Sequence, residues 1–449
     1  AVLDRVDGGD RLDAECAGDL RVFVDVDLGE DDLAVGGRGD LLEDGADRLA
    51  RAAPGRPEVD DDGRRLGLLD DLGLERAVGD VDGHAAHTLA AGARGVPSAR
   101  LSAMSDTVRA GVDEANVTTW IVAHVGGVTP PLSWSMIAGG HSNLTYEVRD
   151  AAGRRMVLRR PPLSHGLASA HDMGREHRII SGLRGSAVPV ARALGYCEDP
   201  AVNGAPFYLM DFVDGHVVRD RAAAERVLDP AARRRASESL VDTLAAIHSV
   251  DLGAVGLADL GRHEGYVARQ LKRWHGQWHA QKTRELPLID EVHDELARRI
   301  PAQGPATIVH GDYRLDNCIV GDDGTVRAVL DWEICTLGDP LADLGLFTVY
   351  WTGPGDEPSP WLGQATTAPG FMDRAGLIER YARATGRDVR HVEYYRAFAY
   401  WKLACIVEGV YARYLGGALG ARSREELEPF RLQVEAAAGG ARRSLDLLA

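Results

Sequence analysis

Hydrophobic positions recur with two different periods along this chain, and the change of period divides it into two parts. Between residues 133 and 215, short apolar runs are separated by Gly, Pro and polar turn residues, a pattern typical of β-strands. Strands are expected within 134–150 (two strands around a glycine-containing turn), 154–162, 189–199 and 206–215, and helices over 106–125 and 169–185. This first part therefore reads as a small α+β lobe.

Helical periodicity dominates the second part, after residue 215. The apolar spacing predicts helices over 229–249, 266–280, 286–300 and 341–351, and three long helices beyond Phe371. Only the segment 310–333 interrupts them, as strand, loop and strand. The expected fold class is α+β and two-lobed: a small β-rich N-lobe over 104–213, a hinge near 211–215 and a larger helical C-lobe over 214–449. A cleft between two lobes is a preferred ligand site.

Residues 1–103 differ in composition from everything that follows. They hold 24 Asp and Glu against 12 Arg and no Lys, a net charge of −12, and they lack Ile, Tyr, Trp and Met. This acidic, low-complexity extension has too little aromatic and β-branched volume for a core, so we expect disorder. GC-rich DNA translated outside a gene gives the same composition, and we favour a product that begins at or near Met104. The alternative is a genuine acidic tail that repels or recruits partners.

Charge and cysteine content exclude several classes of protein. The net charge of −17 argues against a nucleic-acid partner, because such binding surfaces are basic. Since no apolar run reaches the roughly 18 residues of a membrane span, no membrane partner is expected. The five cysteines are scattered and form no C-x-x-C pair, so they indicate neither a disulfide framework nor a zinc site. These features are typical of a protein of the reducing cytoplasm.

The stretch HGDYRLDNCIVGDDGTVRAVLDWE, residues 310–333, concentrates the groups that phosphoryl transfer needs. Asp312 and Asn317 lie in a polar loop, and Asp331 follows an apolar run, 326–330, that predicts a buried strand. Transfer from ATP needs one carboxylate to accept a proton, and oxygen ligands that hold Mg²⁺. H-G-D-x-x-x-x-N has the spacing of the protein-kinase catalytic loop. The alternative is a set of turn-forming Asp and Asn residues, but all three positions satisfy one mechanism together.

This segment, with GDPLADLG after it, resembles the aminoglycoside phosphotransferase/choline kinase family, a branch of the protein-kinase-like fold. VLRRPP and SAHDMGREHR are similar to the phosphotransferase module that is fused to some acyl-CoA dehydrogenases, and the resemblance spans roughly residues 115–420. It implies ATP and Mg²⁺ as cofactors. It also implies roles for Asp312 (catalytic base), His310 (support of the loop), and Asn317 and Asp331 (metal ligands). Glu333 follows Asp331 by two residues and is expected to assist the metal directly or through water. Asp339 and Asp343 are expected to be structural.

Further nucleotide contacts are expected in the N-lobe. Two glycines in AGGHSNLTYEV let backbone amides approach phosphate, although Gly-Gly in a hairpin is often only a turn. Kinases pair a lysine on the third strand with a helix glutamate; here an arginine stands in its place. The predicted nucleotide-binding residues are Gly139, Gly140, Ser142, Asn143, Arg159, Glu176 and the hinge residues Met210, Asp211, Phe212 and Val213.

The function predicted from the sequence is ATP- and Mg²⁺-dependent phosphorylation of a hydroxyl group on a small molecule. A nucleotide-binding pseudokinase or scaffold is the main alternative, and the intact Asp312, Asn317 and Asp331 argue against it. A protein kinase is disfavoured because D-W-E leads directly into the next helix without an A-P-E motif. The resemblance suggests a hydroxyacyl thioester as acceptor; sugars, amino alcohols and antibiotics such as aminoglycosides stay open.

Overall fold

The computed structural model describes residues 111–138, 143–163, 172–353, 356, 364–417 and 423–448. The predictions for residues 1–103, including the start near Met104, lie outside these residues, as do those for Gly139, Gly140 and Ser142. Within the described residues, no helix combines the length and the apolar character that crossing a membrane would require.

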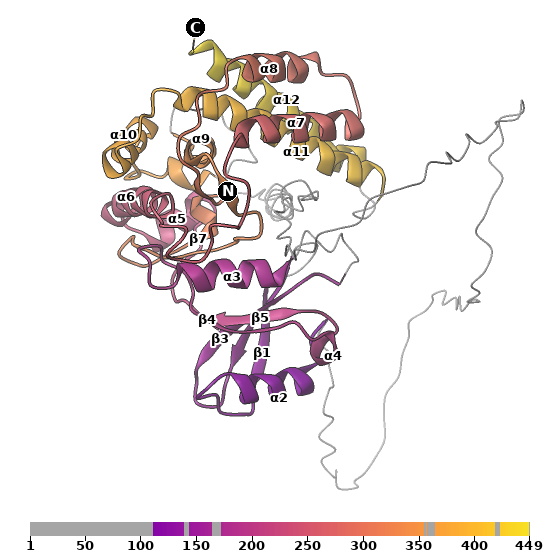
Figure 1. The fold of residues 1–449 in the computed structure, drawn as a ribbon, viewed down its shortest axis with the longest axis vertical. Helices are drawn as coiled ribbons and strands as arrows, with labels where there is room; N and C mark the ends of the chain where they lie inside the picture. Colours follow the sequence, from indigo (N-terminus) through magenta and orange to yellow (C-terminus); the bar gives the residue numbers. More distant parts are fainter. Residues whose placement is uncertain are drawn as a thin grey trace, which may run out of the picture. The chain divides into compact units, whose positions relative to one another are not determined.

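The N-lobe is built on an antiparallel sheet, which has five strands in the described residues, in the order β1-β2-β3-β5-β4 (Figure 1). The strands are β1 (Ser133–Ala138), β2 (Leu144–Arg149), β3 (Arg155–Arg160), β4 (Ala193–Cys197) and β5 (Phe207–Asp211). All four neighbouring pairs are antiparallel, and Leu158 of β3 lies opposite Tyr146 on one side and Leu209 on the other. β3 is therefore the central strand of the described sheet.

Each face of this sheet is covered by one helix, α2 (Glu114–His124) or α3 (Met173–Leu183), as Figure 1 shows. Alternate residues of a strand point to opposite faces, and β5 follows this rule. Phe207 and Leu209 pack in one apolar cluster with α2, whereas Tyr208 packs in another with α3. The alternation of side chains along a strand thus determines which residues of β3 and β5 face α3, and Arg159, opposite Tyr208 in the register, lies on that face.

Aspartate side chains set the starts of many helices. Asp113 accepts a hydrogen bond from the backbone N–H of Asn116 at 3.0 Å, which begins α2 at Glu114. The predicted helix over 106–125 was therefore wrong for residues 111–113; its first residues, 106–110, lie outside the described chain. Asp172 caps α3 in the same way, and such a cap satisfies an N–H group that the first turn leaves unpaired.

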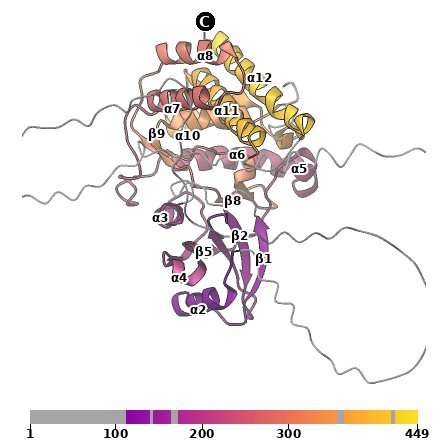
Figure 2. The ribbon, with the colours of Figure 1, turned by 90° about the vertical axis from the view of Figure 1, so that its right-hand side faces the viewer.

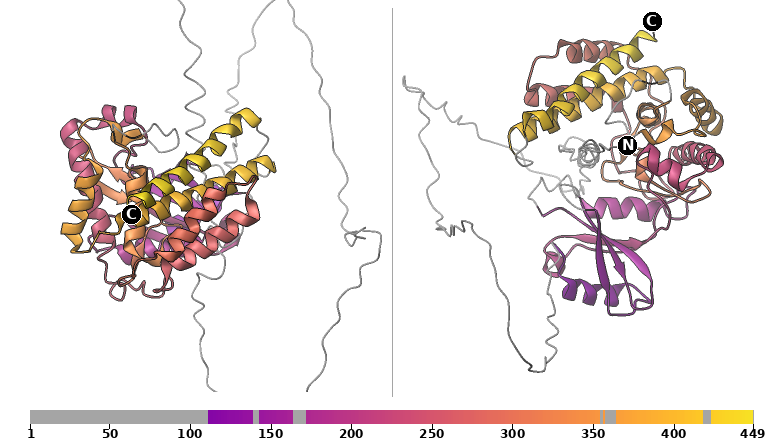
Figure 3. Two further views of the ribbon diagram at one scale, coloured as in Figure 1. Left: turned by 90° about the horizontal axis from the view of Figure 1, so that it is seen from above. Right: turned by 180° about the vertical axis from the view of Figure 1, so that it is seen from behind.

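The C-lobe is mainly helical, as predicted. Its helices are α5 (Arg221–Val227), α6 (Pro230–Ile247), α7 (Tyr266–Gln281), α8 (Pro287–Arg298), α9 (Pro340–Tyr350), α10 (Arg374–Thr385), α11 (Val392–Leu415) and α12 (Arg424–Asp446); a short helix, α4 (Pro200–Asn203), lies in the N-lobe. α11 packs against α7, α8, α9 and α12, and Figures 2 and 3 show α12 lying along it. Trp274 and Trp278 of α7 are buried in this helical core.

Two short strand pairs hold the loops of the segment 310–333. β6 (Thr307–Val309) pairs with β9 (Thr336–Gly338), and β7 (Cys318–Val320) pairs with β8 (Val326–Val329). A short 3₁₀ turn, η3 (Leu315–Asn317), closes the first loop, and a second, η4 (Gln364–Thr367), lies before α10. The first loop thus begins where β6 ends, and Asp331 follows β8. The expected α+β fold with a β-rich N-lobe and a helical C-lobe is confirmed.

Candidate active site

The loop that starts at His310 is held by a buried carboxylate, Asp343 of α9. Its oxygens accept the backbone N–H groups of His310 at 2.6 Å and Gly311 at 2.8 Å. His248 donates to the same carboxylate from Nε2 at 3.3 Å and accepts from the Tyr381 hydroxyl at Nδ1. Burial alone would raise the pKa of Asp343, but the hydrogen bonds from His248 and Gly311 hold it below the ordinary value. Asp343 therefore positions the loop, as the sequence predicted.

Gly311 is required by the shape of this turn. Its φ of +87° is in the left-handed region, which favours glycine. A Cβ at this position would also lie 2.9 Å from Cδ1 of Ile334, too close for ordinary contact. The glycine of H-G-D therefore lets the loop pass the D-W-E segment closely.

The His310 side chain links the two loops of the site. Its Nε2 lies 2.9 Å from the carbonyl oxygen of Leu330, and the backbone N–H of Asp312 points to Nδ1 at 3.3 Å. Because a carbonyl only accepts, Nε2 carries the proton and Nδ1 accepts, so the ring is in one neutral tautomer. The ring also packs against Trp332, with centroids 4.8 Å apart. These contacts agree with a supporting role for His310 in the loop.

Asp312 is buried, with 5% of its surface exposed. The side-chain amide of Asn317 donates to its Oδ2 at 2.8 Å and to its backbone carbonyl at 2.9 Å, while Nε of Arg314 lies 3.4 Å from Oδ2. Burial raises the pKa of Asp312, and the positive charge of Arg314 opposes this only in part. The carboxyl group is thus fixed in place and binds a proton more readily than an exposed aspartate.

Asp331 has an unusual backbone. Its φ of +65° makes it the one non-glycine residue with positive φ in the described chain. Such a conformation costs on the order of 1–3 kcal/mol and persists where the surroundings enforce it. The preceding residue, Leu330, donates its N–H to the carbonyl of Asn317 at 2.8 Å, which ties the two loops together. The turn directs the Asp331 carboxylate toward Arg159 of the N-lobe.

Arg159 joins three carboxylates. Its guanidinium lies 2.7 Å from Glu176 of α3, 2.7 Å from Asp331 and 3.6 Å from Glu333. Arg159 and Glu176 are 11% and 1% exposed in their side chains, so this is a largely buried ion pair. Burial raises the pKa of Glu176. Burial also acts on Asp331, but the charge and hydrogen bond of Arg159 outweigh it and lower the Asp331 pKa. The predicted Arg159–Glu176 pair is therefore present in the structure.

Asn143 and Glu333 connect the start of β2 to the D-W-E segment. The Asn143 side-chain amide donates to Glu333 at 3.0 Å, and Asn143 is 3% exposed. Among the described residues, Oδ1 of Asn143 and Nε of Arg159 are buried without a hydrogen-bond partner. Buried polar atoms normally have a partner, so both atoms keep unused hydrogen-bonding capacity beside the D-W-E segment.

The predicted hinge leaves the sheet after β5, and Met210 on that strand is almost fully buried. The backbone N–H groups of Asp211 and Phe212 donate to the carbonyls of Arg192 at 2.9 Å and Arg155 at 3.2 Å. The Arg155 guanidinium also lies 3.3 Å from the centroid of the Phe212 ring. Two backbone N–H groups of the predicted nucleotide-binding hinge are therefore already used within the sheet.

Comparison with known proteins decides the family. The model of the phosphotransferase enzyme family matches residues 133–398, which include the sheet, the Arg159 ion pairs and both loops. The chain belongs to this phosphotransferase family. The predicted family and kinase-like fold are confirmed, and the coarse function is that of a phosphotransferase of small-molecule type.

Similar curated proteins include acyl-CoA dehydrogenase family member 10 of Mus musculus, which is 34% identical over 302 residues (66% of this chain and 28% of that protein). Family member 11 of Gallus gallus is 35% identical over 302 residues (66% of this chain and 38% of that protein). The chain thus spans well under half of the length of these relatives. The predicted similarity to the phosphotransferase module of acyl-CoA dehydrogenases is confirmed.

Solved structures agree with the fold. A Ralstonia eutropha protein assigned as an aminoglycoside phosphotransferase is 33% identical, with a TM-score of 0.65 over 75% of this chain and 99% of that chain. The GDP complex of aminoglycoside 2′-phosphotransferase-IIIa is 12% identical, with a TM-score of 0.50 over 73% of this chain and 99% of that chain. The second similarity concerns the fold alone.

A cationic region of this phosphotransferase was missed in the sequence. Lys402 of α11 lines a small pocket with Gly311 and Asp343, and it interacts electrostatically with Asp312. Burial, together with the charge of Arg273, lowers the pKa of Lys402 to about 8. Both cations lie over the ring of Trp274, at 5.2 Å for Arg273 and 5.8 Å for Lys402. No local motif signals this region, because α7 and α11 meet only in the fold.

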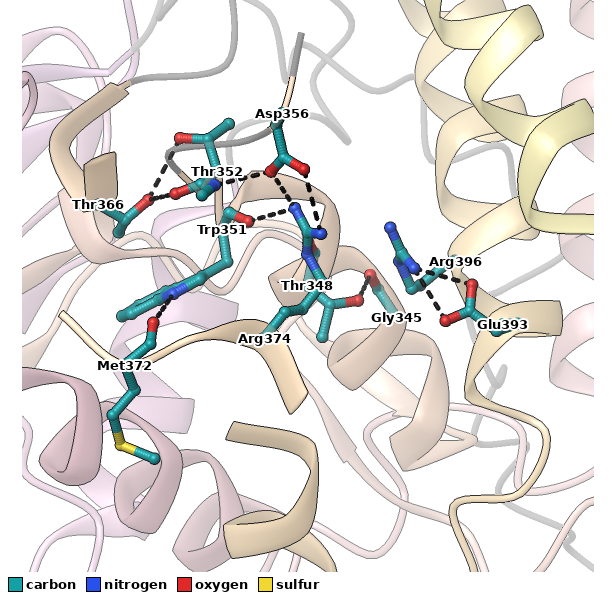
Figure 4. A network of polar contacts seen from close by, with 11 residues as sticks. Gly345, Thr348, Trp351, Thr352, Asp356, Thr366, Met372, Arg374, Glu393 and Arg396 are labelled. Atoms are coloured by element: carbon teal, nitrogen blue, oxygen red, sulfur yellow. Dashed lines mark hydrogen bonds and ion pairs between the residues drawn. The ribbon is translucent and has the colours of Figure 1, made fainter. Parts of the chain in front are cut away.

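A polar network fixes the segment that follows α9 (Figure 4). Arg374 donates to the carbonyls of Thr348 at 2.9 Å and Trp351 at 2.7 Å, and the Trp351 indole donates to the Met372 carbonyl at 2.9 Å. Trp351 also lines a second small pocket, whose wall includes Arg314 of the loop. The network therefore holds one wall of this second pocket in place.

Proposed function

We propose that this chain is an ATP- and Mg²⁺-dependent phosphotransferase that moves the γ-phosphate of ATP to a hydroxyl group of a small molecule. The observation that carries the proposal is one connected polar unit. Asn317 donates to Asp312 and its carbonyl accepts from the residue before Asp331, so the three predicted residues occupy two loops held together. Arg159 connects this unit to the N-lobe.

The donor set fits Mg²⁺, which prefers hard oxygen ligands. Asp331 and Glu333 offer carboxylates that share Arg159 as a neighbour, and Asn317 offers an amide oxygen because its amide nitrogen is turned to Asp312. When bound, the metal would neutralise charge on the phosphates of ATP. The depressed pKa of Asp331 keeps its carboxylate ionised and able to act as a ligand.

Arg159 would orient the phosphates. Its planar fork can hold a carboxylate and a phosphate at the same time. Glu176 fixes one side of the guanidinium at 2.7 Å. The other side contacts Asp331 in the structure, and it could bind a phosphate group in place of that carboxylate. Arginine thus takes the position that lysine has in protein kinases, and it stays charged at every working pH.

Asp312 would accept the proton of the acceptor hydroxyl. Asn317 and the backbone contact to His310 hold its carboxylate in one orientation, and a positioned base of this kind contributes typically about 10²–10⁴-fold. Its raised pKa brings it closer to the pKa of a base that works near neutrality. For adenine, the N–H of Val213 and the hinge carbonyls are the groups to expect, since those of Asp211 and Phe212 donate within the sheet.

Lys402 beside the loop offers a partner for an anionic acceptor. It interacts electrostatically with Asp312 and Asp343 and lies near Arg273, whereas Arg314 is paired with Asp312 and Asp316. A phosphate of a coenzyme A thioester could pair with Lys402, while an amino group of an aminoglycoside would place like charge beside it. The relatives named as acyl-CoA dehydrogenase family members add support for acyl chemistry. We therefore propose a hydroxyacyl thioester as the acceptor class.

One assay tests both the phosphotransferase activity and the acceptor class. It measures transfer of phosphate from radiolabelled ATP to a hydroxyacyl-coenzyme A, the free hydroxy acid, choline and kanamycin. Asp312→Asn should reduce transfer by at least about 10²-fold while nucleotide affinity is kept. Asp322→Asn, an exposed neighbour in the same segment, is the matched control and should stay active. A wild-type protein that binds ATP and transfers nothing to any acceptor would favour the pseudokinase.

The acceptor class has its own variant. Lys402→Met keeps the length of the side chain and removes its charge, so KM for the thioester should rise about 10-fold while ADP formation without acceptor is unchanged. If kanamycin or choline were the preferred acceptor, the anionic class would be wrong and the phosphotransferase assignment would stand.

A further inference from the structure

A second polar cluster lies between α7 and α8, away from the loops described above. His275 and His279 are one helical turn apart on α7, and Asp290 is in the first turn of α8. Nε2 of His275 lies 2.7 Å from Oδ1 of Asp290, and Nε2 of His279 lies 3.0 Å from the same oxygen. The two Nε2 atoms are 3.1 Å apart. Three ligand-type atoms therefore form one small triangle.

Hydrogen bonds account for two sides of this triangle. A neutral imidazole carries a single ring proton and the Asp290 carboxylate only accepts, so both histidines can donate from Nε2 to Oδ1 of Asp290. The two Nε2 atoms then face one another at 3.1 Å without a hydrogen bond between them. In the other tautomer of each ring, Nε2 carries a lone pair instead of the proton, and all three atoms can then bind one cation.

The size of the triangle matches a metal coordination shell. With metal–ligand bonds of about 2.0–2.1 Å, neighbouring ligand atoms lie about 3.0 Å apart in octahedral geometry and about 3.3 Å apart in tetrahedral geometry. The three observed separations, 2.7, 3.0 and 3.1 Å, lie close to the octahedral face. Imidazole and carboxylate ligands together suit Zn²⁺, Fe²⁺ or Ni²⁺ rather than Mg²⁺ or Ca²⁺.

The surroundings hold the ligands in place on one side and leave the other side open. The ring of His293 on α8 stacks on His275, with centroids 3.7 Å apart and planes within 6°. On an adjoining face of α7, Trp274 and Trp278 are buried in the helical core, which fixes the rotation of the helix. The side chains of His279 and Asp290 are 44% and 40% exposed, so a cation can enter from solvent.

We propose that His275, His279 and Asp290 bind one divalent transition-metal ion, with the remaining coordination positions open to water. The site is independent of the proposed phosphoryl transfer, because none of the three residues contacts the catalytic loop. A bound ion would join α7 to α8. It would thereby stabilise the part of the C-lobe in which the Trp274 ring packs against Arg273 and Lys402. The chemical class is a borderline-soft cation, for which Zn²⁺ is the natural probe.

Zinc titration of the tag-free, chelator-treated chain tests this site, with Mg²⁺ in excess so that the oxygen ligands of the cleft are occupied. We expect one equivalent of Zn²⁺ by calorimetry, visible absorption bands with Co²⁺, and a melting temperature that rises with zinc concentration. His279→Ala and Asp290→Asn should each weaken Zn²⁺ binding about 10-fold or more and remove most of the rise. Their metal-free melting temperatures show whether each variant is folded.

His391→Ala is the matched control, because His391 is an exposed histidine whose side chain makes no capping hydrogen bond at the start of α11. It should leave zinc binding unchanged. Equal zinc affinity in wild type, His279→Ala and Asp290→Asn would overturn the proposal, and so would a wild-type chain that binds no Zn²⁺ at micromolar concentration.

Discussion

Two polar clusters of the C-lobe are held in different ways. Around the catalytic loop, Asp312 and Asp343 are almost fully buried, and their hydrogen bonds come mainly from backbone N–H groups and neighbouring side chains. Between α7 and α8, His279 and Asp290 are partly exposed and contact mainly one another. A buried polar group must have its partners built in, whereas an exposed one can take them from solvent. The first cluster should therefore tolerate substitution far less than the second.

The largest effect is expected for Asp331→Ala. This change removes the carboxylate that we place on the metal and leaves Arg159 with one partner fewer. ATP turnover should fall below detection, and the Mg²⁺-dependent part of nucleotide affinity should disappear with it. Equilibrium nucleotide binding with and without Mg²⁺ measures both. Normal turnover in this variant would exclude Asp331 as a metal ligand.

Asp343→Ala should cost the most stability. It removes the acceptor for the N–H groups of His310 and Gly311, and each buried group left unpaired costs about 1–3 kcal/mol. The free energy of unfolding, measured with denaturant, should drop by at least about 2 kcal/mol. The structural role of Asp343 would be refuted by a variant as stable as the wild type.

The pH dependence should separate transfer from nucleotide binding. Burial raises the pKa of Asp312, so its base form is lost first as the pH falls. The pKa of Asp331 is lowered by Arg159, so its carboxylate persists to lower pH. Acidification should therefore reduce kcat/KM for the acceptor before it weakens nucleotide binding, and parallel titrations of both quantities measure the order. The two aspartates should affect the free energy of unfolding in opposite ways. The contribution of Asp312, whose pKa is raised, falls as the pH rises, and the contribution of Asp331, whose pKa is lowered, falls as the pH drops.

The smallest effect is expected for Asp290→Asn in the absence of metal. Exposed ion pairs contribute about 0–1 kcal/mol, so the free energy of unfolding of the chelator-treated chain should change by less than about 1 kcal/mol. Denaturant unfolding of the metal-free protein measures it. A large loss would show that the α7–α8 cluster stabilises the fold without any cation, and the contrast with Asp343 would no longer hold.

The sequence predicted one cluster and missed the other for a physical reason. Asp312, Asn317 and Asp331 lie within one 24-residue stretch, 310–333, whose strands and turns are local. The α7–α8 cluster combines residues from two helices, and a pair of histidines four apart on a helix is no specific signal by itself. The position of Asp290 beside that pair depends on how the helices pack, which periodicity does not determine.

Other features show the same division between local and tertiary information. The strand predicted within 206–215 is present as β5, because a short apolar run bounded by turn residues is a local signal. The predicted helix began before α2 does, because Val108 and Val112 continue the apolar period of the sequence. The cap formed by Asp113 sets the start of α2 at Glu114. Lys402 could not be assigned to the site, since α11 follows the catalytic loop by a long stretch of chain.

Charge balance around Arg159 has one more consequence. A single positive charge there faces the formal negative charges of Glu176, Asp331 and Glu333, so the group carries a formal excess of two negative charges. Free ATP would add further negative charge to this excess, whereas its magnesium complex brings the missing cation with it. On the proposed function, electroneutrality therefore couples the two ligands: nucleotide and metal should enter together, and either one alone should bind poorly.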